Sequence, residues 1–138
     1  MGIDVVVETE FGEAEDRVGD PHSYLARALD LPGLEDTVCL RFVDPYGDTV
    51  FNRSQIPVFI SELESLRSRV TDVALHQEAA RRLEAARQAG WDAAIVRKYE
   101  VAIDRVASAP VLAHLEAVLA LARRANGKVH MYIKCYGD

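Results

Sequence analysis

The stretch KVHMYIKCY at residues 128–136 decides the fold, because apolar and polar side chains alternate along it. In an extended chain, one face carries the apolar set Val129, Met131, Ile133 and Cys135. The opposite face carries the polar and aromatic set His130, Tyr132, Lys134 and Tyr136. Such alternation is typical of a β-strand with one buried side. Because the run is long and apolar, we predict that it lies inside a sheet, between earlier strands.

Two hairpins are predicted to supply the neighbouring strands. Residues 3–8 alternate in the same way, and a turn at Gly12 leads to a weaker, charged return strand over 14–18. Residues 38–43 also alternate, and the turn sequence DPYGD leads from them into a return strand over 49–51. Pro at the second turn position with Gly behind it favours a type I turn with a bulge, which is typical of hairpins.

Helices are predicted to connect these strands. Asp20 and Pro21 form a helix start, and Ser54 is the expected cap of a second helix with an apolar stripe. The most apolar helix follows residue 108 and ends at Gly127, which can take a left-handed conformation.

The stretch 71–107 has the pattern of an inserted helical hairpin, and 16 of the 19 alanines in the chain lie after residue 70. Thr71 and Asp92 are the expected caps of its helices, and Trp91 is expected to pack on Val96 as a hydrophobic staple. Since alanine buries little area, we expect this segment to pack less tightly than the rest.

These elements predict an α+β domain over residues 1–138, with the helical insertion 71–107 inside it. Its sheet would be mostly antiparallel, with about five strands and with helices packed on one face. The side chains expected beneath the helices are Ile3, Val5, Val7, Leu40, Phe42, Met131 and Ile133.

Composition excludes several classes of protein. Of the 138 residues, 49% are hydrophobic and 28% are charged, which is typical of a globular domain and not of a disordered chain. The longest apolar run in the second half covers only residues 117–122, whereas a membrane span needs about 18 residues. We therefore expect no membrane segment.

The charge is concentrated at the start of the chain. The net charge is −6, and residues 1–20 alone carry −6, because seven acidic residues stand against Arg17. Nucleic-acid binding needs clustered lysine and arginine, so it is not expected here, whereas a basic protein partner is electrostatically allowed. The candidates for an acidic binding surface are Glu8, Glu10, Glu13, Glu15 and Asp16. The alternative is a solvated acidic hairpin without a binding role.

The sheet face opposite the helices is the first candidate for a binding surface. Alternation places on it the partner-binding candidates Arg41, His130, Tyr132, Lys134 and Tyr136. Arginine and tyrosine are enriched among the residues that dominate protein interfaces. The structural alternative is a solvated face with side chains stacked across strands.

Other reactive groups favour structural roles. Asp44 and Asp48 flank the predicted turn, where aspartate is common, and a cation site would need further ligands. Cys39 shares a predicted face with Arg41, which lowers a thiol pKa, but a structural role is the better interpretation for both Cys39 and Cys135. His114 borders an apolar helix stripe and is interpreted as a packed residue. No catalytic residue, metal site or cofactor is predicted.

The predicted subcellular location is the bacterial cytoplasm. Residues 1–4 lack the basic start of a signal peptide. In the cytoplasm both cysteines would stay reduced. Thirteen of the 16 basic residues are arginine, which is typical of a GC-rich bacterial genome.

The strings LRFVDPYGDTVFN at 40–52 and VHMYIK at 129–134, with Gly137 and Asp138 at the end, resemble a set of small single-domain bacterial proteins that have no assigned activity. The likeness covers residues 1–70 and 108–138, and the segment 71–107 looks like an addition. The resemblance implies a fold and a bacterial source, and it transfers no catalytic residue.

Two functions remain open. The favoured prediction is a non-catalytic domain that binds another bacterial protein, in one version as an immunity-like neutraliser of a toxin. The alternative is a small-molecule-binding protein or small enzyme with a pocket between the sheet and the helices. A homodimer formed through 71–107 is a further open prediction.

Overall fold

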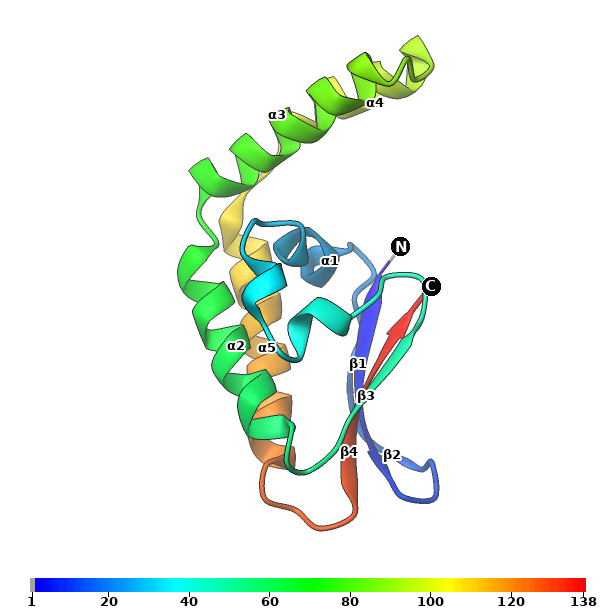
Figure 1. Ribbon diagram of the computed structural model, residues 1–138, viewed down its shortest axis with the longest axis vertical. Coiled ribbons are helices and arrows are strands. Elements are labelled where there is room, and N and C mark those ends of the chain that lie inside the picture. Colours follow the sequence, from blue (N-terminus) through cyan, green and yellow to red (C-terminus); the bar gives the residue numbers. More distant parts are fainter. Residues whose placement is uncertain (1) are drawn as a thin grey trace.

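The computed structural model describes residues 2–138, which form one antiparallel sheet and a set of helices (Figure 1). The strands are β1 (Ile3–Thr9), β2 (Ala14–Val18), β3 (Asp48–Phe51) and β4 (Met131–Gly137). Their order across the sheet is β2-β1-β4-β3, and every neighbouring pair is antiparallel. The α+β class and the antiparallel sheet are confirmed, but the described residues form four strands and not five.

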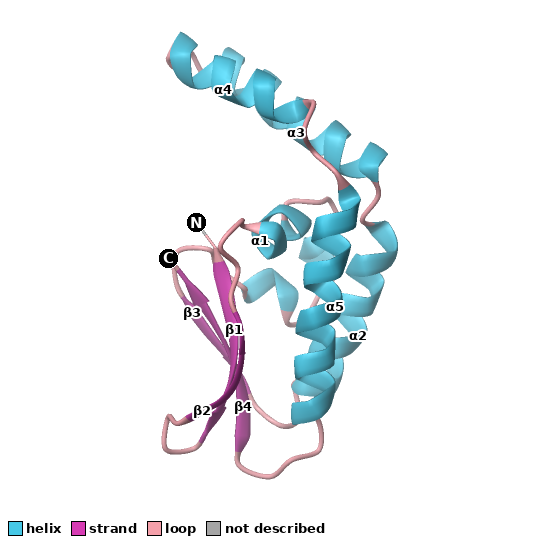
Figure 2. Cartoon of the chain, turned by 180° about the vertical axis from the view of Figure 1, so that it is seen from behind, coloured by secondary structure: helices cyan, strands magenta, loops and turns pink. Residues whose placement is uncertain are grey.

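Five α-helices are described within residues 2–138. They are α1 (Tyr24–Leu29), α2 (Ile56–Arg69), α3 (Asp72–Gln88), α4 (Ala93–Ile103) and α5 (Ser108–Ala125). Two short 3-10 helices, η1 (Leu34–Asp36) and η2 (Leu40–Phe42), lie between α1 and β3 in the chain. Helices α1, α2 and α5 lie on one side of the sheet, and the opposite face carries no helix (Figure 2).

Strand β4 occupies the interior of the sheet, as its sequence predicts. It pairs with β1 along its whole length, from Met131 opposite Thr9 to Gly137 opposite Ile3, and with β3 on its other side. Ile133 and Cys135 are fully buried against the helices. The two chain ends therefore sit on adjacent central strands, and the core forms between this sheet and α1, α2 and α5.

The predicted hairpin over 38–51 is wrong in its first half. Residues 40–42 form the 3-10 helix η2, and only β3 is extended. The Glu62 carboxylate on α2 accepts the backbone N–H groups of Val38, Cys39 and Leu40, the last two at 2.9 Å. A strand would need backbone groups here for its ladder, so Glu62 stabilises the 3-10 conformation in place of a fifth strand.

Because residues 40–42 are not a strand, two side chains lie elsewhere than the alternation predicts. Phe42 was expected beneath the helices but is exposed, because no strand directs it inward. Arg41 was expected on the uncovered sheet face, yet its segment packs beside α2, where its guanidinium carbon lies 4.7 Å from the Phe42 ring centre. Leu40 is fully buried, in agreement with the prediction.

Two helix starts differ from the sequence prediction by a few residues. Helix α1 begins at Tyr24 and not at Pro21, although the Asp20 carboxylate still accepts the Tyr24 N–H at 2.7 Å. Before α2, the Asn52 side chain and not Ser54 acts as acceptor, taking the N–H groups of Ser54 and Gln55. The Asp20 side chain thus satisfies the first donor of α1 from a distance, whereas the donors that Asn52 binds precede α2.

Helices α3 and α4 form a hairpin that projects beyond the rest of the molecule (Figure 1). The predicted caps are confirmed, since Thr71 accepts the Ala74 N–H and Asp92 accepts the Ala94 N–H. Trp91 contacts Tyr99, with ring centres 6.0 Å apart. The staple from Trp91 to Val96 stays a prediction.

No single helix within residues 2–138 is long and apolar enough to cross a membrane. Only α4 and α5 taken together have that length and composition, and they are bent by 83° at the break between them.

We expect Glu62→Ala to lower the free energy of unfolding by about 3 kcal/mol, because three backbone donors lose a charged acceptor. The matched control is Glu64→Ala on the same helix, where only the exposed ion pair to Arg123 is lost and about 0.5 kcal/mol is expected. Urea unfolding of both variants measures the difference. Equal costs for the two variants would contradict the role given to Glu62.

Candidate binding surface

The uncovered side of the sheet presents a band of side chains from β1, β4 and β3. Strand β4 contributes alternate residues to this side, and the register places Lys134 between Val6 of β1 and Val50 of β3. We define the open face by its six members, which are the buried Val6 and the half-buried or exposed Glu8, Val50, Tyr132, Lys134 and Tyr136. Because their parity is opposite to that of the buried Ile133 and Cys135, the helices do not reach them.

Side chains on the open face hold one another in place. The Tyr136 hydroxyl donates a hydrogen bond to Glu8, and the Lys134 Nζ lies 4.4 Å from the centre of the Tyr136 ring. The Tyr136 hydroxyl raises the pKa of Lys134, and the carboxylates of Glu8 and Asp48 add to this effect. Lys134 therefore remains a cation, and these side chains lose less freedom when a partner binds.

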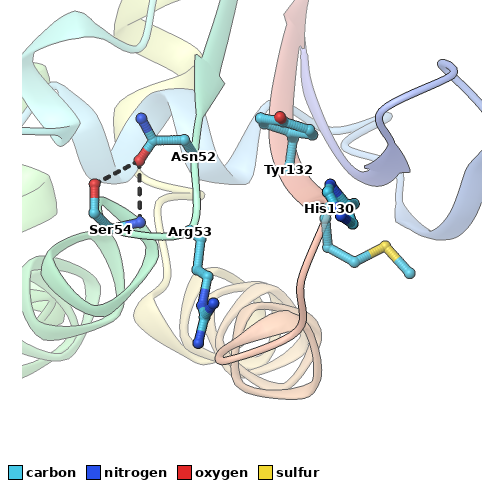
Figure 3. Close-up of a pocket in the computed structure, with 6 residues that line it drawn as sticks. Asn52, Arg53, Ser54, His130 and Tyr132 are labelled. Carbon is cyan, nitrogen blue, oxygen red and sulfur yellow. Dashed lines mark hydrogen bonds between the residues drawn. The ribbon is translucent and has the colours of Figure 1, made fainter.

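A pocket lies at one end of the open face, where β4 begins. Its volume is about 410 Å³, and its lining residues are Asn52, Arg53, Ser54, His130, Met131 and Tyr132. Figure 3 shows Asn52, Arg53 and Ser54 on one side, with His130 and Tyr132 on the other. We call this the end pocket.

The walls of the end pocket are fixed to different degrees. The Asn52 side-chain oxygen accepts from the Ser54 hydroxyl at 2.7 Å and from its N–H at 3.0 Å, which orders that side (Figure 3). On the other side, the His130 Nδ1 lies 2.9 Å from a Glu10 oxygen, and His130 has a left-handed φ of 60°. A guanidinium and an imidazole beside one opening are suited to an anion, whereas the Ser54 hydroxyl already donates its hydrogen to Asn52.

Of the five predicted partner-binding residues, the structure brings four together. Tyr132, Lys134 and Tyr136 lie on the open face, and His130 lies at its end in the pocket wall. Arg41 does not join them, because residues 40–42 form η2 and not a strand of the sheet. Arg53 occupies a comparable place and was not predicted, because nothing in the local pattern shows that the β3–α2 connection lies beside the start of β4.

The acidic candidates do not form one surface. Glu8 is bonded to Tyr136 on the open face, and Glu10 lies beside His130. Asp16 turns toward the helices, where the hydrogen bond from Arg124 of α5 lowers the pKa of this carboxyl. Glu13 and Glu15 are exposed at the β1–β2 turn and the following edge strand. The outer acidic surface is therefore centred on this turn.

Both thiols have surroundings that suppress reactivity. Cys39 and Cys135 are buried and unpaired. Burial raises the pKa of the Cys135 thiol to about 12. Burial, together with the Glu62 carboxylate, also raises the pKa of Cys39, where the sequence had suggested lowering by Arg41. Neither thiol is a nucleophile in this environment.

The two turn carboxylates have local roles. Asp44 accepts the Tyr46 N–H at 2.8 Å, as aspartate commonly does in a turn, and Asp48 begins β3. Within residues 2–138, no cluster of three or more histidine, cysteine, aspartate or glutamate side chains could hold a metal ion.

His114 belongs to a buried polar group on the helix side of the sheet. Its side chain is 8% exposed, and its Nε2 lies 3.7 Å from the fully buried Asp20 carboxylate without a hydrogen bond. Burial lowers the pKa of His114 below 6.5, and the carboxylates of Asp20 and Asp4 oppose this in part. The imidazole is thus kept neutral, which fits the packed role predicted for it.

No family model, curated protein or solved structure matches this chain. The predicted resemblance to small bacterial proteins therefore stays a prediction, and the function rests on the geometry alone.

The lowered pKa of His114 predicts a pH dependence of stability. The unfolded chain binds a proton at His114 near pH 6.5 and the folded chain only at lower pH, so stability is complete above 6.5 and falls as the pH drops below it. His114→Gln should remove part of this slope in urea unfolding between about pH 7.5 and about pH 5.5. The matched control is His76→Gln, an exposed position, which should keep the slope. An unchanged slope in His114→Gln would contradict the assignment.

Proposed function

We propose that this chain is a non-catalytic protein-binding domain whose open face and acidic β1–β2 turn hold a basic protein. The observation that carries this proposal is the preordered group of Tyr136, Lys134 and Glu8 on a sheet that helices cover on one side only. Tyrosine on a rigid strand supplies large contact area at low entropic cost, and such residues dominate interfaces.

A protein partner would have to contact more of the surface than the open face. The four strands have 7, 5, 4 and 7 residues, so at about 3.3 Å per residue and about 4.8 Å between strands the sheet offers roughly 360 Å². A stable protein complex covers about 800 Å² on each partner. The adjoining β1–β2 turn and the end pocket are the surfaces that would supply the remainder.

Charge favours a basic partner. Residues 3–18, which form β1, β2 and the turn between them, carry −5 of the net charge of −6. Complementary charge accelerates encounter and excludes acidic competitors. Neutralisation of a basic toxin in the bacterial cytoplasm is the version that we favour, and two unpaired buried thiols suit a reducing compartment.

The end pocket supports a second candidate function, binding of a small anionic molecule. Arg53, His130 and Ser54 are among the residues that line one opening of about 410 Å³. This is close to the alternative predicted from the sequence, but the pocket lies at the end of the sheet and not beneath it. A rise in melting temperature with inorganic phosphate, lost in Arg53→Ala, would favour this candidate.

The test of protein binding uses the basic proteins encoded by neighbouring genes, each titrated calorimetrically against the full chain. We expect one of them to bind, and we expect Tyr132→Ala to weaken that binding at least about tenfold, since truncated tyrosines at interface centres cost more than about 1.4 kcal/mol. Glu13→Lys at the exposed turn should also weaken binding and reduce its salt dependence.

The matched control is Glu35→Ala in η1, an exposed acid on the helix side of the molecule, which should bind as the unaltered chain does. Circular dichroism checks that each variant is folded. Equal affinity of Tyr132→Ala and the unaltered chain, or no binding by any of the basic proteins, would overturn the proposal.

A further inference from the structure

Helix α4 has an apolar side that no other part of the chain buries. None of its 11 residues is buried, and Ile95 and Tyr99 are 44% and 46% exposed. A helix this short is marginal in water unless an apolar face packs against something. Helix α3 provides one neighbour, but its buried residues leave much of the apolar stripe of α4 uncovered. The α3–α4 hairpin therefore keeps an exposed apolar surface that another molecule could bury.

The uncovered stripe borders a continuous groove. One hollow of about 340 Å³ lies near the hairpin tip, between Trp91, Ala85 and Tyr99. A second hollow of about 370 Å³ lies at the base, where α1 also contributes, and it too is lined by Tyr99. Because Tyr99 and Arg82 belong to both, we treat them as one hairpin groove. Its length along α3, from Leu75 to Ala89, is about 21 Å.

Most charges on the rim of the hairpin groove are already paired. Arg82 lies 2.6 Å from Asp30 of α1, and the buried Glu78 accepts hydrogen bonds from Arg81 and Arg82. The exposed Arg27 of α1 also lines the base hollow and makes no ion pair within residues 2–138, so an occupant meets one unpaired cation there. The small floor residues Ala79, Ala85 and Ala89 allow a helix to approach closely.

We propose that the hairpin groove is filled by the hairpin of a second copy of this chain, giving a two-fold symmetric four-helix bundle. Trp91 is 51% exposed at the tip, and the base hollow lies at the opposite end of the same groove. A two-fold axis through the middle of the hairpin places the tip of each copy at the base of the other. A projection and a hollow at opposite ends of one surface are what a self-complementary interface requires.

Charge and shape both favour a second copy as the occupant. Residues 71–107 contain six basic and six acidic residues and sum to zero, so two hairpins do not repel each other, although the whole chain carries −6. The hairpin projects from the rest of the molecule, so the two sheets would lie at opposite ends of the bundle without collision (Figures 1 and 2). The acidic β1–β2 turns stay well apart in this arrangement.

The available area is adequate for such a dimer. Helix α3 has 17 residues and is about 25 Å long, and two helices side by side are about 20 Å wide. The flat projection is roughly 500 Å², which interdigitating side chains raise toward the about 800 Å² per partner of a stable complex. The open face is not part of this interface, so the inference does not rest on the proposed function.

Sedimentation equilibrium of the full chain tests the proposal, with Trp91 fluorescence as a second readout. Trp91 is the only tryptophan in the sequence, and since it already packs on Tyr99 within one copy, the change of its emission with concentration is what reports the dimer contact. We expect a particle of twice 15.3 kDa and a blue shift of emission as the concentration rises. Trp91→Ala should sediment as a monomer, and Tyr99→Ser should lose both the dimer and the blue shift.

The matched control is Val73→Ser, an exposed apolar residue of α3 outside the hairpin groove, which should remain dimeric. Helical circular dichroism confirms that each variant is folded. A monomer at every concentration, with an unshifted Trp91 emission, would overturn the assignment of a second copy and leave the groove to a helix of another protein. A dimer that survives both groove substitutions would place the contact elsewhere and also overturn it.

Discussion

The buried carboxylate of Asp20 joins strand β1 to helix α1, and the rest of the structure depends on this link. It is 2% exposed and accepts three backbone N–H groups, from Ile3 at the start of β1 and from Tyr24 and Leu25 in α1. Its own N–H is bound by the Asp4 carboxylate at 2.8 Å. A buried charge is tolerated only when its lone pairs are satisfied, so these segments are held in one relative position. A side chain at Gly2 would collide with the Asp20 carbonyl, which explains glycine there.

With β1 fixed in this way, β4 completes the sheet and determines what each face presents. Ile133 and Cys135 enter the core beside β1, so Lys134 between them must point away from the helices, as must Tyr132 and Tyr136 on either side. Lys134 lies on the ring of Tyr136, whose hydroxyl is held by Glu8. The proposed binding surface is thus a direct consequence of core packing on the other side of the same strand. The α3–α4 hairpin lies outside this arrangement, which is why we assign it a separate role.

The parts that follow from local pattern could be predicted from the sequence. The alternation in β4, its interior position and the caps Thr71 and Asp92 need only neighbouring residues, and the structure agrees with them. The segment 38–43 could not be predicted in this way. Its alternation is genuine, but Glu62, more than twenty positions later, supplies acceptors that stabilise η2 instead. The same limit explains why Arg41 was wrongly predicted to lie on the open face and why Arg53 was not predicted to line the end pocket. Both positions depend on which distant segments lie together.

The alternation of β4 can be measured directly by the reaction of thiols with a small labelling reagent in the folded chain. Cys135 points into the core, and Lys134→Cys would place a thiol one residue away on the open face. We expect the thiol at position 134 to react as an exposed thiol does and Cys135 to react only through unfolding. If the two thiols react at equal rates, or if Cys135 reacts faster, then the open face is not where it is described here and the proposed binding surface fails with it.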